Sequence, residues 1–509
     1  TGKVPEQIHS ELRALGEFGP EETVIVSAHP RDSFFGYFDQ YGLHSYNPSL
    51  VEGTLFETFP GMENPLAAPG QFSGTFDALE LFNSKRFESI RTPSAGEIRD
   101  YNQARALIQD QGRTGATADE IEAQLVELDQ QVIKDILVRT PEEQDALWEA
   151  DGSAECNLKP FCVSDSDCES GQVCAPAEMI CIQPCGSDAD CGGATCSDGR
   201  CDPGWTPYAA PCTSFEGVVD DWFRLIDYGV VRTGMGNSDT HKLFTQTEGG
   251  CPRNFIRSEV AQGLGVDRRE LARSIKAGKL VASYGPFVEA WLGNAGIGET
   301  LETTSGMQSI PLRVRVQSPG WFDVDRVEVY RSGRLVHVFT GAGDELDPES
   351  TADVSGLRLP NRSVVNLDVT VEEPVPEVDS WYVIIAMGVN GRDLSPVYNE
   401  HPYLKLQIGD ILSRSFNSVP LMASMGIDLA GTPRVFRVYP YAVANPIFID
   451  VDGGGYDAPH ATPDWAAGSL ASQSQGLSTP LAKPVDRQDY QQMQLRHFMS
   501  LMHRAFEGL

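Results

Sequence analysis

The chain has 509 residues, of which 41% are hydrophobic and 22% are charged, and its formal net charge is −33 at pH 7. Such a composition is typical of a globular protein with several domains, and the sequence contains no apolar run long enough to cross a bilayer. The large negative charge argues against a nucleic-acid ligand, whose phosphates would be repelled, and favours a solvated outer surface.

Two apolar runs near the start predict buried strands. The run "TVIVSA" covers residues 23–28 and is followed at once by His29 and Pro30, and "FDALELFN" covers residues 76–83. Because it directly follows an apolar strand and is fixed by Pro30, His29 is a candidate metal ligand. Six further histidines have no ligand-like neighbours in the sequence, and we expect surface or packing roles for them: His9, on a predicted helix, and His44, His337, His401, His497 and His503.

Three helices are predicted after these strands. Thr117 and Glu120 form a capping box in front of a run with helical apolar spacing that reaches residue 138. The run "VVDDWFRLIDYGV" (218–230) predicts an amphipathic helix that ends near Gly229, and a further helix is predicted near residues 267–277. Helices therefore separate the strands of the first part of the chain, which indicates an α/β arrangement.

A cysteine-rich insert interrupts this part of the chain, at residues 153–212. It contains two similar blocks, as "CVSDSDCESGQVC" and "CGSDADCGGATC" show, with gaps wider than those of zinc-binding pairs. Because the insert has almost no aliphatic residues, we expect disulfides to hold it together, which indicates an extracellular, cell-surface or periplasmic location. The spacing leaves the connectivity open among its ten cysteines, of which the first and last flank the two blocks: Cys156, Cys162, Cys168, Cys174, Cys181, Cys185, Cys191, Cys196, Cys201 and Cys212. The odd cysteine, Cys251, is left as a thiol or as a disulfide bond to another chain.

The segment "TGMGNSDTHKLF", residues 233–244, carries the strongest sign of chemistry. Its glycines allow a tight turn, and Asp239 and His241 lie two residues apart, so that in an extended backbone they point the same way. A carboxylate with a neutral imidazole suits Zn, Mn or Fe better than Ca or Mg. The alternative is a simple turn in which Asp239 caps the loop. Since His29 and Asp239 both follow strands, a β/α barrel would bring them to one rim.

The chain changes character after residue 290. Short β-branched runs separated by turn residues predict a β-sandwich-like domain over residues 291–460. Within it, "FIDVDGGGYDAPH" (448–460) offers a weak case for calcium, but it lacks the EF-hand spacing, and a plain turn is favoured. Residues 461–484 have the composition of a linker. Residues 485–509 predict an amphipathic helix that docks on the protein's own body or on a partner, with self-docking as the default, and its stripe is Leu495, Phe498, Met502, Ala505 and Leu509.

The motifs together resemble the PHP (polymerase and histidinol phosphatase) superfamily, in its CehA/McbA-like branch of metallohydrolases. The resemblance rests on "VSAHPRD", "FDALELFN", "DDWFRLIDYGVVRTGMGNSDTH", "CPRNFI" and "GKLVASYGPFVEAWLGNAGIGE". It implies the later half of a distorted β/α barrel, formed by residues 1–152 and 213–290 around the insert. It also implies that two or three divalent ions (Zn, Mn or Fe) are held at the C-terminal rim, with His29, Asp239 and His241 as ligands. The family's strand that bears Asp or Glu corresponds to the one with Glu80, to which we assign no ligand role.

One departure from the family is large, because its His-x-His motif and the ligands that follow have no counterpart here. Three or four strands cannot close a barrel, and they would leave hydrophobic strand edges open. We therefore expect a separate upstream fragment of the same precursor to supply the missing ligands, with Cys251 as its covalent tether. The first residue, Thr1, fits proteolytic processing.

These observations predict an exported, bacterial-type, metal-dependent hydrolase of phosphoesters or of carboxyl or carbamate esters, in which activated water is the nucleophile. The main alternative is a catalytically silent surface-binding or structural assembly protein on a PHP-like scaffold. A third interpretation gives the insert a recognition role near the mouth of the site.

Overall fold

A computed structural model describes a little over half of the chain. The described residues are 3–31, 36–41, 43, 72–83, 87–92, 104, 107–108, 111, 115–149, 171–175, 180–191, 196–197, 200–201, 217–239, 250–258, 265–304, 306–319, 322, 324–340, 365–390, 394, 438–463 and 465–466. Among them, no helix has the length and apolar character required to traverse a bilayer. His241, the terminal segment 485–509 and most of the insert lie outside these residues.

The first sheet is parallel. It consists of β1 (Val26–Ser27), β2 (Ala78–Asn83) and β7 (Thr233–Asn237), with β2 in the middle. Val26 lies opposite Ala78, which lies opposite Thr233, so that the three carboxyl ends meet at one edge. The prediction of two early strands is confirmed, although the first one is only two residues long.

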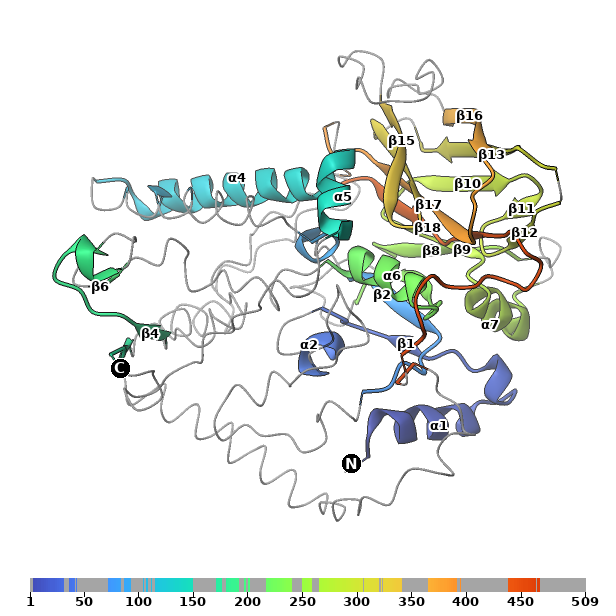
Figure 1. The fold of residues 1–509 in the computed structure, drawn as a ribbon, viewed down its shortest axis with the longest axis horizontal. Coiled ribbons are helices and arrows are strands. Elements are labelled where there is room, and N and C mark those ends of the chain that lie inside the picture. Colours follow the sequence, from blue (N-terminus) through green and yellow to red (C-terminus); the bar gives the residue numbers. More distant parts are fainter. Residues whose placement is uncertain are drawn as a thin grey trace.

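Helices and short 3-10 turns accompany the sheets: α6 packs on β2, α5 lies beside β15, and α4 extends away from the sheets (Figure 1). The predicted capping box is present, because Thr117 Oγ1 accepts from the Glu120 backbone N–H and Glu120 accepts from the Thr117 N–H. The helices are α1 (Pro5–Leu15), α2 (Tyr37–Tyr41), α4 (Ala118–Leu137), α5 (Pro141–Glu149), α6 (Val218–Asp227) and α7 (Arg268–Lys276), and the 3-10 turns are η1 (Pro20–Glu22), η4 (Phe87–Ser89) and η7 (Asp188–Cys191). The three helices predicted from periodicity are confirmed as α4, α6 and α7.

Helix α6 packs closely on the parallel sheet. Its Trp222 is fully buried, and the indole Nε1 donates to the backbone oxygen of Arg232 (2.7 Å) just before β7. Gly234 is required here, because a Cβ at this position would lie 2.4 Å from a methyl carbon of Leu81 and 3.1 Å from the Trp222 ring. The glycine in the motif therefore lets strand and helix approach each other.

The second part is a pair of packed, mainly antiparallel sheets. One has the order β11-β10-β13-β16, and the other contains β12-β19-β17-β18-β9-β8, with β14 pairing β17 and β15. Burial alternates along β13, as expected for a strand with one face on the core, whereas β17 is buried throughout. The strands are β8 (Arg253–Ile256), β9 (Leu280–Ser283), β10 (Phe287–Leu292), β11 (Ala295–Gly296), β12 (Thr300–Glu302), β13 (Ser309–Gln317), β14 (Arg326–Arg331), β15 (Arg334–Thr340), β16 (Val365–Pro374), β17 (Ser380–Met387), β18 (Tyr441–Ala444) and β19 (Ile447–Asp450).

The two parts share their core instead of forming separate bodies. Strands β8 and β9 lie in the same sheet as β17–β19, and the predicted boundary between residues 290 and 291 falls within β10. One continuous hydrophobic cluster contains Trp222 of α6 and Trp381 of β17. The fold is therefore mixed α/β with several antiparallel sheets, and the described residues contain a three-stranded parallel sheet in the region where the later half of a barrel was expected.

Two asparagine amides close the outer edge of β7. Asn445, directly after β18, accepts from the Gly234 N–H (2.7 Å) and donates to the Gly234 oxygen (2.9 Å). Asn254 of β8 makes the same pair of bonds to Gly236, at 2.8 and 2.9 Å. Each side chain thus acts as a peptide group would in a neighbouring strand. The backbone N–H and C=O groups of Gly234 and Gly236 therefore have hydrogen-bond partners on this edge of β7.

The insert repeats one small motif. Hairpin β3–β4 (Val173–Ala175 and Ile180–Ile182) sets Cys174 opposite Cys181, and hairpin β5–β6 (Cys196–Ser197 and Arg200–Cys201) sets Cys196 opposite Cys201. The last two cysteines of each block therefore occupy matching positions. In Figure 1 these hairpins lie apart from the sheets.

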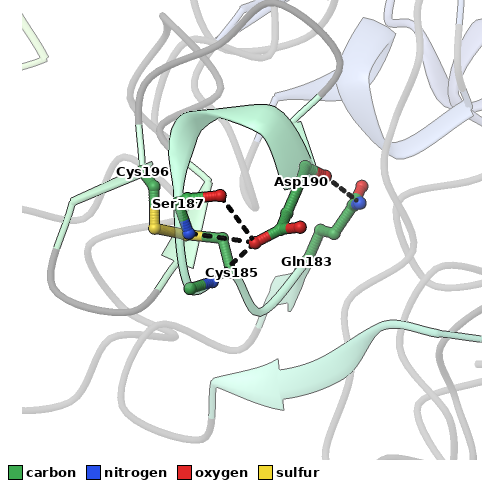
Figure 2. The surroundings of a disulfide bond; sticks show 6 residues. Gln183, Cys185, Ser187, Asp190 and Cys196 are labelled. Carbon is green, nitrogen blue, oxygen red and sulfur yellow. Dashed lines mark hydrogen bonds between the residues drawn. A yellow bond between two sulfur atoms is a disulfide. The ribbon is translucent and has the colours of Figure 1, made fainter.

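A disulfide joins Cys185 to Cys196 in the second block (Figure 2). Beside it, Asp190 Oδ2 accepts from the backbone N–H groups of Gly186 and Ser187, both at 2.9 Å, and these bonds lower the pKa of the carboxyl. Disulfide formation is thus confirmed for this pair, while the partners of the other predicted disulfide cysteines stay a prediction.

Cys251 lies between the two parts of the molecule and is fully buried in the shared core. The next residue, Pro252, follows a cis peptide bond and packs beside Gly236, since a Cβ there would lie 3.2 Å from the proline ring. A covalent tether to another chain at Cys251 would require this core to open.

Candidate functional site

His29 and Asp239 meet at the carboxyl edge of the parallel sheet. Each lies two residues beyond its strand, β1 or β7, and their side chains reach across the end of β2. The distance from His29 Nε2 to Asp239 Oδ2 is 3.6 Å, and the two side chains are 30% and 24% exposed. The prediction that these two residues converge is confirmed, and both remain accessible to a ligand.

Both residues hold an unusual backbone conformation. Their φ angles are +49° for His29 and +47° for Asp239, and among the described residues only Ser332, in the β14–β15 turn, is another non-glycine residue with positive φ. This left-handed region is unfavourable for residues with a Cβ and persists where the surroundings enforce it, often at functional sites. Two of three such residues therefore coincide with the two candidate ligands.

Glu80, in the middle strand β2, organises this edge. It is 3% exposed, and its Oε2 accepts from the His29 backbone N–H (2.9 Å) and from Asn83 Nδ2 (2.9 Å). Its Oε1 accepts from Asn237 Nδ2 (3.0 Å) at the end of β7. A buried carboxylate needs such donors, and here they tie the ends of all three strands together. Glu80 thus fixes the backbone that presents His29.

The arrangement fits one shared metal ion. Two ligand atoms bound to a tetrahedral ion at about 2.1 Å lie about 3.4 Å apart, close to the distance between His29 Nε2 and Asp239 Oδ2. One nitrogen and one carboxylate oxygen match the preferences of Zn, Mn or Fe. Glu80 Oε2 accepts two N–H bonds and Oε1 accepts one, so that Glu80 supports the site through these contacts, and we assign it no ligand role. The same pair also forms an ordinary ion pair when His29 is protonated.

A second acidic group occurs where calcium was considered. Carboxylate oxygens of Asp379, Asp450 and Asp452 lie within 4.8 Å of one another in the described structure. However, Asp450 accepts from the backbone N–H groups of Gly453 (2.6 Å) and Gly455 (2.7 Å), and Asp379 accepts from that of Val451. The bonds from Gly455 and Gly453 lower the pKa of Asp450. Hydrogen bonds of this kind, from nearby backbone N–H groups to an aspartate, are typical of a plain turn.

Two of the histidines assigned to packing roles are described. His9 Nδ1 bonds Thr75 Oγ1 (2.8 Å), and burial lowers the pKa of the imidazole. His337 of β15 pairs with the buried Glu373 of β16, whose other oxygen accepts from Tyr382 Oη (3.0 Å). Neither lies at the strand ends, in agreement with their predicted roles. His44, His401, His497 and His503 lie outside the described residues.

Two carboxylates of helix α6 contact buried groups outside the helix. Asp220 of α6 pairs with the fully buried Arg91 (3.2 Å) and accepts from the Thr92 N–H (2.7 Å). At the end of α6, Asp227 Oδ1 accepts from Trp381 Nε1 (3.0 Å), and burial raises the pKa of Asp227 to about 6. Neither carboxylate lies at the strand ends.

The sequence interpretation missed the organising role of Glu80, Asn237 and Asn254. One sign was available, because Glu80 interrupts the apolar run "ALELF", and a charged residue at a buried strand position must have partners. The identity of those partners required the fold.

In comparisons with protein-family models, with curated proteins and with solved structures, nothing matches this chain.

Proposed function

We propose that this protein is an exported metal-dependent hydrolase of the PHP type, acting on a phosphoester or on a carboxyl or carbamate ester. The observation that supports this most is the convergence of His29 and Asp239, from two different strands, to 3.6 Å at one exposed edge. Strained backbone at both positions adds to it, because an ordinary surface ion pair contributes too little to justify such strain.

The ligand roles follow from the contacts. His29 would bind the ion through Nε2 and Asp239 through Oδ2, and His241, outside the described residues, is the proposed third ligand. When bound, such an ion lowers the pKa of water and stabilises developing negative charge on an ester. Glu80 holds the His29 backbone, and Asn237 links Glu80 to the strand that leads to Asp239. These outer contacts preorganise the ligands before any ion arrives.

A two- or three-metal site needs more ligands than these. The edge of β7 is closed by Asn254 and Asn445, whereas β1 pairs only with β2 among the described residues. Added strands of a distorted barrel would therefore join at β1, beside His29. This supports the proposal that an upstream fragment of the same precursor completes the barrel and the metal site.

An exported location is part of the same proposal. The Cys185–Cys196 disulfide and the matched hairpins of the insert support it, because such modules persist in oxidising compartments.

The test uses the full-length purified protein. After chelation and reloading with Zn²⁺ or Mn²⁺, metal content is measured per chain, and hydrolysis of an aryl phosphate and of an aryl carbamate is followed. We expect Asp239→Asn to lower metal affinity by about 100-fold, as loss of one ligand from a small ligand set should. Glu289→Gln on β10 is the control, since that carboxylate is similarly exposed (28%) but lies in the other sheet.

The same sample tests the upstream fragment, because intact mass measured under native conditions reveals any associated polypeptide. Well-folded protein that takes up neither metal, or an Asp239→Asn variant that binds as tightly as the wild type, would contradict the hydrolase proposal.

The alternative is a catalytically silent binding or assembly protein on the same scaffold. It is favoured by one observation: among the described residues, His29 and Asp239 are not part of a group of three or more possible ligands. Metal-free, folded protein would be its expected form.

A further inference from the structure

Helix α1 faces the body of the protein with its polar side. Glu6 Oε2 accepts from Ser73 Oγ (2.5 Å), His9 bonds Thr75 Oγ1 (2.8 Å), and Arg13 Nη2 donates to the Thr75 oxygen (2.6 Å). The helical period places residues 6, 9 and 13 on one face. No residue of α1 is buried. The helix is therefore held to the sheet by hydrogen bonds and not by apolar packing.

The apolar residues of α1 lie on a different face and are exposed. Ile8, Leu12 and Leu15 are 37%, 46% and 80% exposed, and their spacing of four and three residues aligns them in one stripe. A surface helix normally turns such a stripe toward the core. Here the usual arrangement is inverted, which indicates that another apolar surface covers the stripe.

The described chain ends close to this helix. Gly74 N–H donates to the Trp465 oxygen (3.2 Å), and the Trp465 ring packs edge-on against Phe72, with centroids 4.8 Å apart. The neighbouring residues Ser73 and Thr75 are those that hold α1. Ala466 is buried as well, so that the first residues of the predicted linker belong to the body.

The chain that follows has the length and the pattern to reach the stripe. Residues 467–484 number 18 and could span about 60 Å when extended, while α1 with its 11 residues is only about 16 Å long. In residues 485–509, apolar side chains recur at alternating spacings of three and four: Leu495, Phe498, Met502, Ala505 and Leu509. This spacing matches the stripe of α1, as two helices packed along one seam require.

We infer that residues 485–509 form a helix that packs on the Ile8–Leu12–Leu15 stripe of α1 in the same chain. The apolar spacing supports this contact and charge does not, because residues 485–509 carry three acidic and three basic side chains and Glu11 beside the stripe pairs with Lys3. The contact would hold the C-terminal segment against the N-terminal helix. It does not depend on metal binding or on hydrolysis, and it is tested without either.

The test places a photoreactive benzoylphenylalanine at position 12 in the full chain, and at position 10 as the control, since Ser10 is exposed but lies on another face of α1. After irradiation we expect cross-links from position 12 to peptides of residues 485–509 in the same molecule, and few from position 10. Cross-links to a second copy, to another polypeptide, or to neither would each overturn the inference.

Hydrogen exchange gives a second measurement. Leu12→Asp should speed the exchange of backbone amides in residues 495–506 by about tenfold or more, because the docked helix would be released. Ser10→Asp should leave them unchanged. Protection of strand β17 reports that each variant is folded. Equal exchange in Leu12→Asp and the wild type would contradict the contact.

Discussion

The parallel sheet and the antiparallel sandwich differ in where their polar residues lie and in how exposed these residues are. In the sandwich, a polar residue such as Glu373 is buried with partners, because it pairs with His337 and accepts from Tyr382 Oη. In the parallel sheet, the polar residues gather at the strand ends, where His29 and Asp239 are strained and accessible. From this difference we expect the buried pairs to stabilise the fold and the accessible strand ends to serve the metal site proposed above.

The largest expected effect tests the buried-pair side of this comparison, at the contact between helix α6 and Arg91. Asp220→Asn removes the charge that pairs with the fully buried Arg91 and that also lies 3.7 Å from Arg139. Loss of one partner leaves a buried charge uncompensated, which should lower the free energy of unfolding by about 3–5 kcal/mol. Urea denaturation measures this. Asp368→Asn, which breaks an exposed pair with Arg313, should change it little; equal losses in both variants would remove the distinction between core and surface pairs.

The second effect depends on pH. Burial raises the pKa of Asp227 from 3.8 to about 6, so that the folded chain binds this proton more tightly than the unfolded chain does. The resulting stability is present below about pH 4 and is lost as the pH rises through 6, up to about 3 kcal/mol in total. Asp227→Asn keeps an acceptor for Trp381 Nε1. It should remove the fall in the free energy of unfolding between pH 4 and 6, which urea denaturation at each pH measures.

His460 supplies a check on this prediction, because it lies near enough for its charge to lower the pKa of Asp227. In His460→Gln the free energy of unfolding should still fall between pH 4 and 6, whereas in Asp227→Asn it should not. A slope that survives in Asp227→Asn would have to arise from another group.

The smallest effect tests the strand ends, and here we expect the free energy of unfolding to rise and not to fall. Asp239→Gly relieves a left-handed backbone and should raise the free energy of unfolding by about 1 kcal/mol, while metal affinity is lost. Ser332→Gly, in the β14–β15 turn, should give a similar gain with metal affinity intact. Thermal unfolding and metal titration of both variants separate the two properties. A clear loss of stability in Asp239→Gly would mean that this carboxylate serves the fold.

Local patterns in the sequence predicted much of the fold but little of its assembly. The helices α4, α6 and α7 and the strand β2 follow from periodicity and caps that act over a few residues. The convergence of His29 and Asp239 followed from the rule that parallel strands end at one edge. By contrast, Glu80 acts on residues 51 and 157 positions away, and no local pattern encodes such contacts. The placement of β8 and β9 in the second sheet was missed for the same reason.

The amide of Asn445 has a consequence for synthesis of the chain. It is the side chain that satisfies Gly234 in β7, although it is made 211 residues later. While the ribosome is still translating the sandwich, Gly234 therefore lacks this partner, and on that side of β7 only Asn254 has been made. This edge of β7 can be completed only after the last strands have emerged, so that a nascent or truncated product would leave the N–H and C=O groups of Gly234 without the Asn445 amide.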